Sequence, residues 1–458
     1  MSIPRQRLLG QLLPADLRRF QHYSQLIFDL QVEKYRPGVD SYVLLSLSKA
    51  LAGQPLLPRL QKLRWSQSHL SDHDILHFIS PSLHYLIFNY DGYATSIVSA
   101  DSGTECLFLL DTLLQQVAAA APSLRRLCLA AHETMPCAFV PFSVCRSLRQ
   151  VDISARTLVG RCTYLSALTS LQNLTTLALS GLYTLEDDDV KALQGFSTLE
   201  QIILEGDCAS LGSVLLHVGR SPSTIQKVGI SVIGYNTEKQ AALMAIIVSQ
   251  FSASLEDLRL NTLIDEDIPL HNTIPLPMTV IRPLLSMGQL CNVYWAGGFV
   301  PPSSAGWSNE DFCAMASAWP KLISLVILWD SWPQTRAVPS PTVTLECLPH
   351  IARACPCLRM LRITTLKWTW AADLDAYPIM SHRLERLDTD IYTTEDNSAP
   401  GRTVADTALF LDRLFPYLDA RDNELAPQPQ MSKDIFKHIC TLQAARLQER
   451  RRITSEKR

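Results

Sequence analysis

One short pattern recurs along the whole chain: an apolar residue, two variable residues, an apolar residue, one variable residue and an apolar residue. The copies span residues 60–65, 83–88, 124–129, 148–153, 174–179, 199–204, 225–230, 255–260, 290–295, 322–327, 358–363 and 384–389, with a further copy at 27–32. From 124 to 225 the copies start 24, 26, 25 and 26 residues apart, and several other steps widen to between 30 and 41 residues. A repeat this regular constrains the fold because one unit cannot bury its apolar side alone.

The spacing is typical of a leucine-rich repeat, whose period is about 20–29 residues. Alternation around the middle apolar residue predicts a short strand with one buried face. We therefore expect an α/β fold, a leucine-rich-repeat solenoid with a curved parallel β-sheet inside and helices outside. The side chains that flank the middle residue, such as Lys62 and Arg64 or Arg126 and Cys128, should line its concave face.

The segments between strands predict the outer helices. Residues 71–79, 186–193 and 309–318 start with Ser, Glu or Asn and then become apolar, as helix starts do. Pro81 and Pro122 precede strands, and proline there ends a helix.

The ends of the chain differ from the repeats. We expect a helical N-terminal cap at residues 1–24, an irregular solenoid at 25–400, a C-terminal capping helix at 401–418, and a linker with a basic terminal helix at 419–458. We interpret the basic tail as a solvated helix end, with a nuclear-localisation or nucleic-acid role as the alternative.

Composition excludes several classes of protein. The chain has 41 basic and 44 acidic residues, without the basic excess of a nucleic-acid-binding surface. The longest apolar runs are shorter than the roughly 18 residues of a membrane span, and the N-terminus lacks a secretory signal. We therefore expect a monomer in the cytoplasm, the nucleus or both, with reduced thiols, of which Cys128, Cys208 and Cys291 should be buried repeat residues.

A row of histidines raises the possibility of a metal site. His69, His73 and His77 recur every four residues beside Asp72 and Asp74, and on a helix they would share a face. The motif lacks the glutamate that a zinc protease uses as its base, so we interpret the segment as a polar outer helix.

Two other clusters have structural explanations. The acidic residues 187–189 suit the first turn of a helix, and Cys347, Cys355 and Cys357 lack the second pair of a zinc site, so we expect buried thiols. No phosphate loop, dinucleotide fingerprint or nucleophile elbow occurs. We expect no catalytic residue, no cofactor and no metal, and an enzyme hidden in the inserts is a remote alternative.

The N-terminal stretch LLPADLRRFQHYSQLIFDLQV carries a resemblance to a known family. Its Pro14, Asp16, Arg19, Phe20 and Tyr23, with the later segments PSLHYL, PSLRRL, ACPCLRML and LFPYL, resemble fungal, mushroom-type F-box/leucine-rich-repeat proteins. This resemblance covers nearly the whole chain.

The resemblance implies a substrate receptor of a ubiquitin ligase. In that family an F-box lies upstream of the repeats and docks on the Skp adaptor. Here the repeats begin almost at once, so we expect the receptor portion without the F-box, and the adaptor as a partner only if an F-box lies upstream. The alternative is a free-standing leucine-rich-repeat scaffold or regulator with no ubiquitin link.

Aromatic residues point to a binding region. Seven of the eight tryptophans lie between positions 295 and 370. Tryptophan is enriched at binding hot spots, although these side chains would equally well pack long inserts against the solenoid. We predict a protein-binding site, with no role for nucleic acid or membrane, at Tyr294, Val326, Trp329, Trp332, Met360, Arg362 and Arg386.

Overall fold

A computed structural model describes most of the chain in two compact units. The described residues are 12–33, 41–67, 73–90, 102–136, 142, 145–159, 167–183, 185, 190–191, 193, 196–219, 224–234, 236–263, 277–297, 307–328, 343–368, 379–393, 400–419 and 430–456. The units are Met1–Ile225, here the N unit, and Gln226–Arg458, here the C unit.

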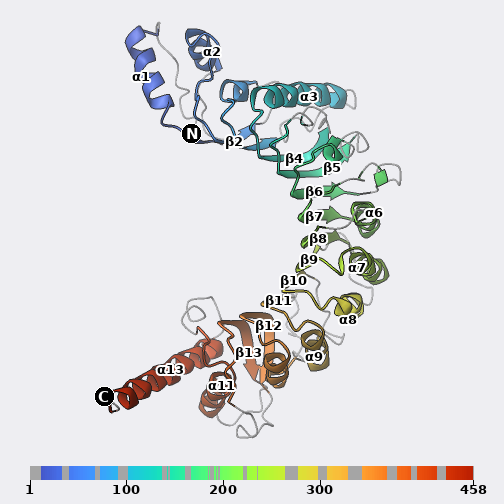
Figure 1. Cartoon of the computed structure of the whole chain (residues 1–458), viewed down its shortest axis with the longest axis vertical. Coiled ribbons are helices and arrows are strands. Elements are labelled where there is room, and N and C mark those ends of the chain that lie inside the picture. The colour runs from blue at the N-terminus through green and yellow to red at the C-terminus, as the bar shows by residue number, and fades with distance from the viewer. Residues whose placement is uncertain are drawn as a thin grey trace. The chain divides into compact units, whose positions relative to one another are not determined.

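The N unit contains strands β1 to β7. In chain order its elements are α1 (Pro14–Ser24), β1 (Asp29–Val32), α2 (Ser41–Ala50), β2 (Lys62–Gln67), the short 3₁₀ helix η1 (Asp74–His77), β3 (Tyr85–Tyr90), α3 (Ser102–Ala120), β4 (Arg126–Pro136), β5 (Gln150–Val159), β6 (Thr176–Leu182), β7 (Gln201–Gly206) and α6 (Cys208–Val218). Each strand pairs in parallel with the next, and α2 and α3 lie on one side of them (Figure 1).

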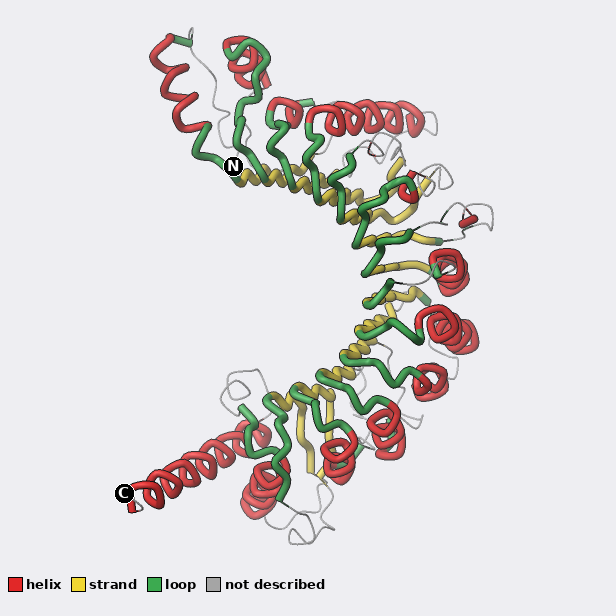
Figure 2. Tube along the Cα trace, viewed as in Figure 1, coloured by secondary structure: helices red, strands yellow, loops and turns green. Residues whose placement is uncertain are grey.

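The C unit repeats the design and adds two long helices. Its elements are β8 (Lys227–Ile233), α7 (Thr237–Phe251), β9 (Asp257–Leu263), α8 (Pro277–Ile281), η4 (Arg282–Ser286), β10 (Asn292–Gly297), α9 (Asn309–Ala318), β11 (Ser324–Leu328), η5 (Leu345–Cys347), α10 (Leu348–Ala354), β12 (Met360–Trp368), β13 (Arg386–Thr393), α11 (Pro400–Leu414) and α13 (Gln430–Glu456). Its strands also pair in parallel in chain order, and α7, α8 and α9 lie along one side of them (Figure 2).

The repeated apolar residues form the core of each unit. In β6, Leu177 and Leu179 are buried, and the same positions of the neighbouring strands, Val151 and Ile202, lie directly beside Leu177 in the register. The chain is therefore an α/β leucine-rich-repeat solenoid, as its spacing predicts, and the side chains that flank each buried residue face the other way.

A recurrent turn connects helix to strand. In five repeats, among others, the amide of the first strand-motif leucine donates a hydrogen bond to the carbonyl three residues earlier, as Leu60 does to Leu57, Leu83 to Ser80, Leu124 to Ala121, Leu322 to Trp319 and Leu358 to Cys355, at 3.0–3.1 Å. Proline is the second residue of each of these turns, where its fixed φ suits the geometry. In these five repeats the proline therefore lies in the turn that starts the strand, besides ending the helix.

Some of the expected helices differ from the prediction. Residues 309–318 form α9 as expected, capped by Ser308, whose hydroxyl accepts the Asp311 amide while the Asp311 carboxylate accepts the Ser308 amide. By contrast, the described part of 71–79 contains only the single turn η1, and most of 186–193 lies outside the described residues. The domain limits expected from the sequence stay predictions.

Several cysteines do not lie where the sequence suggested. Cys128, Cys208 and Cys291 are only half-buried, because Cys128 occupies a solvent-facing strand position, and Cys208 and Cys291 lie at the first residue of α6 and just before β10. Cys347 and Cys355 are buried as expected, whereas Cys357 is exposed.

No helix in the described part of the chain is both long enough and apolar enough to cross a membrane.

Replacing Leu177 with aspartate should destabilise the N unit. Leu177 has no exposed surface, and an unpaired buried carboxylate costs about 3 kcal/mol or more. Thermal unfolding should show a clear loss in the melting temperature of Leu177→Asp. The matched control is Thr176→Asp, one residue earlier and half-buried, which should melt close to the wild type. Equal melting of the two variants would contradict the strand register.

Candidate functional site: the open faces of the two sheets

The C unit presents two rows of side chains on the face opposite its buried leucines. In register across β8 to β13, the first row is Lys227, Asp257, Asn292, Ser324, Met360 and Arg386, and the second is Gly229, Arg259, Tyr294, Val326, Arg362 and Asp388. We call these twelve residues the C face. Strand pleating places them there, because alternate side chains point to opposite sides of a sheet.

Five of the seven predicted binding residues lie on this face. Tyr294, Val326 and Arg362 are direct neighbours on consecutive strands, and Met360 lies beside Arg386. The remaining two, Trp329 and Trp332, lie outside the described residues.

The five differ in how accessible they are. The side chains of Arg362 and Arg386 are 47% and 51% exposed, and Tyr294 and Met360 are half-buried. Val326 is only 6% exposed. It forms an apolar base between Tyr294 and Arg362 and offers a partner little surface of its own.

An acidic residue that the sequence reading missed organises the two arginines. Asp388 Oδ2 lies 3.0 Å from Nε of Arg362 and 4.0 Å from Nη2 of Arg386. Asp388 is the partner of Arg362 in the strand register. Aligning the repeat copies position by position would therefore have placed Asp388 beside Arg362. The shared carboxylate holds both guanidinium groups against the sheet.

The N unit has a second face, which is basic and aromatic. Lys62, Tyr85 and Arg126 are neighbours in one row across β2, β3 and β4. The ring of Tyr85 lies 5.7 Å from Nζ of Lys62 and 5.0 Å from Cζ of Arg126, and Lys62 also pairs with Asp29 at 2.9 Å. The sequence predicted the basic residues of this N face but not the central tyrosine, which accepts both cations on its ring.

A thiol and a carboxyl group share the other row of the N face. Sγ of Cys128 lies 3.6 Å from Oδ2 of Asp152. Burial and then the charge of Asp152 raise the pKa of Cys128 to about 12, so the thiol stays protonated and is a poor nucleophile. Burial also raises the pKa of Asp152, although the Cys128 hydrogen bond and Arg126 oppose that shift.

The described part of the histidine row does not form the polar outer helix expected from the sequence. His73 precedes the single 3₁₀ turn Asp74–His77, so it does not share an α-helical face with His77, while His69 and Asp72 lie outside the described residues. Among the described residues, no group of three His, Cys, Asp or Glu side chains is placed to hold a metal ion. Residues 187–189 also lie outside the described part.

Changing Asp152 to asparagine should alter how stability depends on pH. Because the folded-state pKa of Asp152 is raised, its contribution to stability is fully present below its unfolded pKa and is lost as pH rises through the folded value. Asp152→Asn should therefore melt at a higher temperature than the wild type at pH 7, and the difference should shrink toward about pH 4. Paired thermal melts at both values test this, and a variant that is less stable at pH 7 would contradict it.

Comparison with known proteins yields likenesses to solved structures alone. No family model matches the chain, and no curated protein matches it. A complex of TLR13 with ssRNA13 is similar at 15% identity and a TM-score of 0.44, over 80% of this chain, which spans 43% of that protein. An internalin from Listeria monocytogenes is similar at 10% identity and a TM-score of 0.37, over 82% of this chain and 84% of its own. Rad7 in the yeast Rad7 and Elc1 complex structure is similar at 14% identity and a TM-score of 0.31, over 79% of this chain and 87% of that one.

Proposed function

We propose that this chain is a non-catalytic protein-recognition module that binds its partner on the C face. The observation that carries the proposal is that Tyr294 on β10 and Met360 and Arg362 on β12 flank Val326 of β11 on the same face, with the guanidinium of Arg362 held by Asp388. Tyrosine, methionine and arginine are enriched in interface cores, and tyrosine and arginine among hot spots. A rigid sheet also presents these side chains at a low entropic cost.

The charges of the C face favour a protein over a nucleic acid. Arg362 and Arg386 share the carboxylate of Asp388, and Nε of Arg259 lies 3.5 Å from Asp257. Binding to phosphates requires a large surplus of positive charge that releases counterions, whereas the twelve C-face residues include four basic and two acidic side chains, a surplus of only two. The C face therefore presents guanidinium donors in fixed positions beside apolar side chains. A polypeptide can match both, because it has hydrogen-bond acceptors and apolar side chains of its own.

The N face is suited to attracting an acidic partner. Lys62, Arg64 and Arg126 are basic, and the charges of Asp29 and Asp152 offset only part of this positive charge. Basic side chains of this kind raise the rate at which an acidic partner associates more than they raise its final affinity.

Removing two side chains of the C face should weaken partner binding strongly without unfolding the chain. Tyr294→Ala combined with Arg362→Ala should weaken binding at least about 30-fold, as truncation of hot-spot residues does. A photo-crosslinking residue at position 360 would first identify the bound partner, whose affinity is then measured by calorimetry.

Arg353→Ala is the matched control, since Arg353 is exposed on the outer helix α10 and should bind normally. Equal binding by the double variant and the wild type would place the site elsewhere. A large drop in the melting temperature of the double variant would mean that these residues support the fold.

We further propose that the recognition module serves as the substrate receptor of an F-box-type ubiquitin ligase. The resemblance of residues 12–32 to that family supports this role. So do exposed apolar side chains next to β1, where Tyr23, Leu26 and Phe28 are 53%, 58% and 41% exposed. Contiguous exposed apolar side chains are typical of surfaces that contact another polypeptide. The alternative is a free-standing scaffold or regulator.

The adaptor distinguishes these two roles. If the receptor role is correct, the chain should co-elute with purified Skp adaptor in gel filtration, directly or when an F-box from its own gene precedes it. Leu26→Asp should weaken that complex, whereas Leu263→Asp, at another exposed leucine in the C unit, should leave it intact. No co-elution in either form would favour the free-standing scaffold while leaving the C-face proposal untouched.

A further inference from the structure

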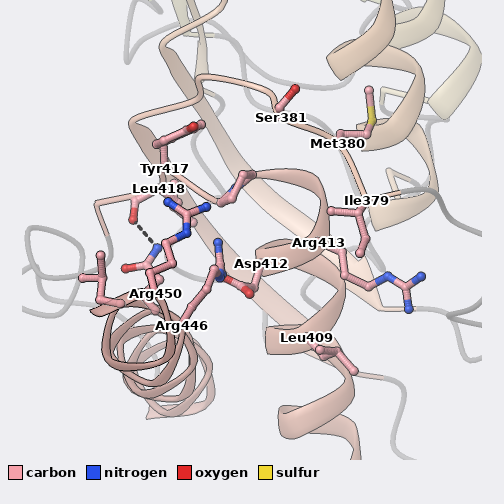
Figure 3. A pocket seen from close by; sticks show the side chains of 13 residues that line it. Ile379, Met380, Ser381, Leu409, Asp412, Arg413, Tyr417, Leu418, Arg446 and Arg450 are labelled. Atoms are coloured by element: carbon pink, nitrogen blue, oxygen red, sulfur yellow. Dashed lines mark hydrogen bonds and ion pairs between the residues drawn. The ribbon is translucent and has the colours of Figure 1, made fainter. Parts of the chain in front are cut away.

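The C unit contains a pocket of about 660 Å³ between α11 and α13 that the repeat pattern does not predict. Leu409, Asp412 and Arg413 of α11 form one wall, and Gln443, Arg446, Leu447 and Arg450 of α13 form another (Figure 3). The segments 379–381 and 416–418 complete it, and the first is tied to α11 by a 2.8 Å hydrogen bond from the Met380 amide to the Arg413 carbonyl.

The pocket lies where the buried stripe of α13 runs beyond the core. Ser432, Ile435, Phe436 and Ile439 recur at helical spacing and are fully buried. The same stripe continues as Gln443, Arg446, Leu447 and Arg450, which line the pocket. These last side chains therefore lie on the face of α13 that points toward α11.

Arg450 supplies the positive charge of the pocket. Asp412 accepts a hydrogen bond from Arg446, so the charge of Arg446 is compensated. The guanidinium of Arg413 points away from Arg446 and Arg450 (Figure 3). Within the described part of the chain no carboxylate pairs with Arg450. The side-chain amide of Gln443 already donates a hydrogen bond to the Leu418 carbonyl, at 2.7 Å.

The remaining walls are apolar and accessible. Ile379, Tyr417, Leu447 and Leu409 are 77%, 57%, 56% and 38% exposed, and all four line the pocket. An exposed apolar cluster of this kind in a protein surface is typical of a binding site. Its volume lies within the range of about 300–1,000 Å³ that is common for ligand pockets.

We propose that this pocket binds a short segment of a partner protein in which an acidic side chain adjoins leucine-like apolar side chains. A carboxylate matches the planar guanidinium of Arg450, and the apolar neighbours match Tyr417 and Leu447. A membrane surface is the poorer fit, because it would engage the exposed Arg451 as readily as Arg450. The pocket shares no residue with the C face, so it is a second recognition site.

The test uses a fluorescein-labelled peptide with the run Leu-Asp-Glu-Leu-Leu and the full chain, in a fluorescence anisotropy titration. Saturable binding below about 1 mM is expected, and a peptide with Asn and Gln in place of the acids should bind more weakly. Arg450→Glu should weaken binding about tenfold or more, because a charge-assisted hydrogen bond becomes a repulsion.

Arg451→Glu is the matched control, since it makes the same change of charge at an exposed residue that does not line the pocket. It should bind the peptide within about twofold of the wild type, as should the Tyr294→Ala and Arg362→Ala double variant of the C face. Equal losses in Arg450→Glu and Arg451→Glu would overturn the proposal in favour of general charge attraction. Absence of peptide binding by the wild type would overturn it, as would preferential binding to phosphatidylserine vesicles.

Discussion

The structure depends on one interaction, the stacking of the middle apolar residue of each repeat against the same residue of the next. Val151, Leu177 and Ile202 show it: they are direct neighbours on three parallel strands, and none is more than 1% exposed. A single six-residue strand has too little apolar surface to stay ordered, so each strand is stable only beside its neighbours. This dependence is why the same short pattern must recur so often in the sequence.

The same stacking determines which side chains are free to recognise a partner. A strand alternates between two faces, so burying Leu361 turns Met360 and Arg362 outward. A parallel register then brings outward residues of distant repeats together, as it does Tyr294 and Arg362 on either side of Val326. Because the outward positions contribute less to the core, they can vary at a smaller cost to the fold than the buried positions can.

The sequence predicted the strands well because their signal is local and periodic. It also predicted α9, where a capping residue precedes a regular apolar pattern. It missed features that depend on contacts across repeats, such as the carboxylate of Asp388 and the ring of Tyr85, although both follow once the copies are aligned by phase. The expected helix at 71–79 is wrong in its described part, where only one 3₁₀ turn forms. The α11–α13 pocket had no sequence signal at all, because it arises from two helices beyond the last repeat.

The arginines at the two proposed sites of the C unit differ in whether a nearby carboxylate fixes them, and this difference affects what each site can bind. On the C face, Arg362 is fixed by a carboxylate that its own sheet provides, so a partner meets a guanidinium whose position is already set. In the pocket, Arg446 is fixed in the same way by Asp412, whereas Arg450, one turn along the helix, has no carboxylate among the described residues. A fixed arginine mainly offers directional hydrogen bonds, and its net charge is small. An unpaired arginine beside apolar surface instead favours a ligand that brings its own negative charge. The two proposed sites of the C unit would therefore select different chemistry in a partner, a polar and aromatic surface at the C face and an acidic, apolar segment at the pocket.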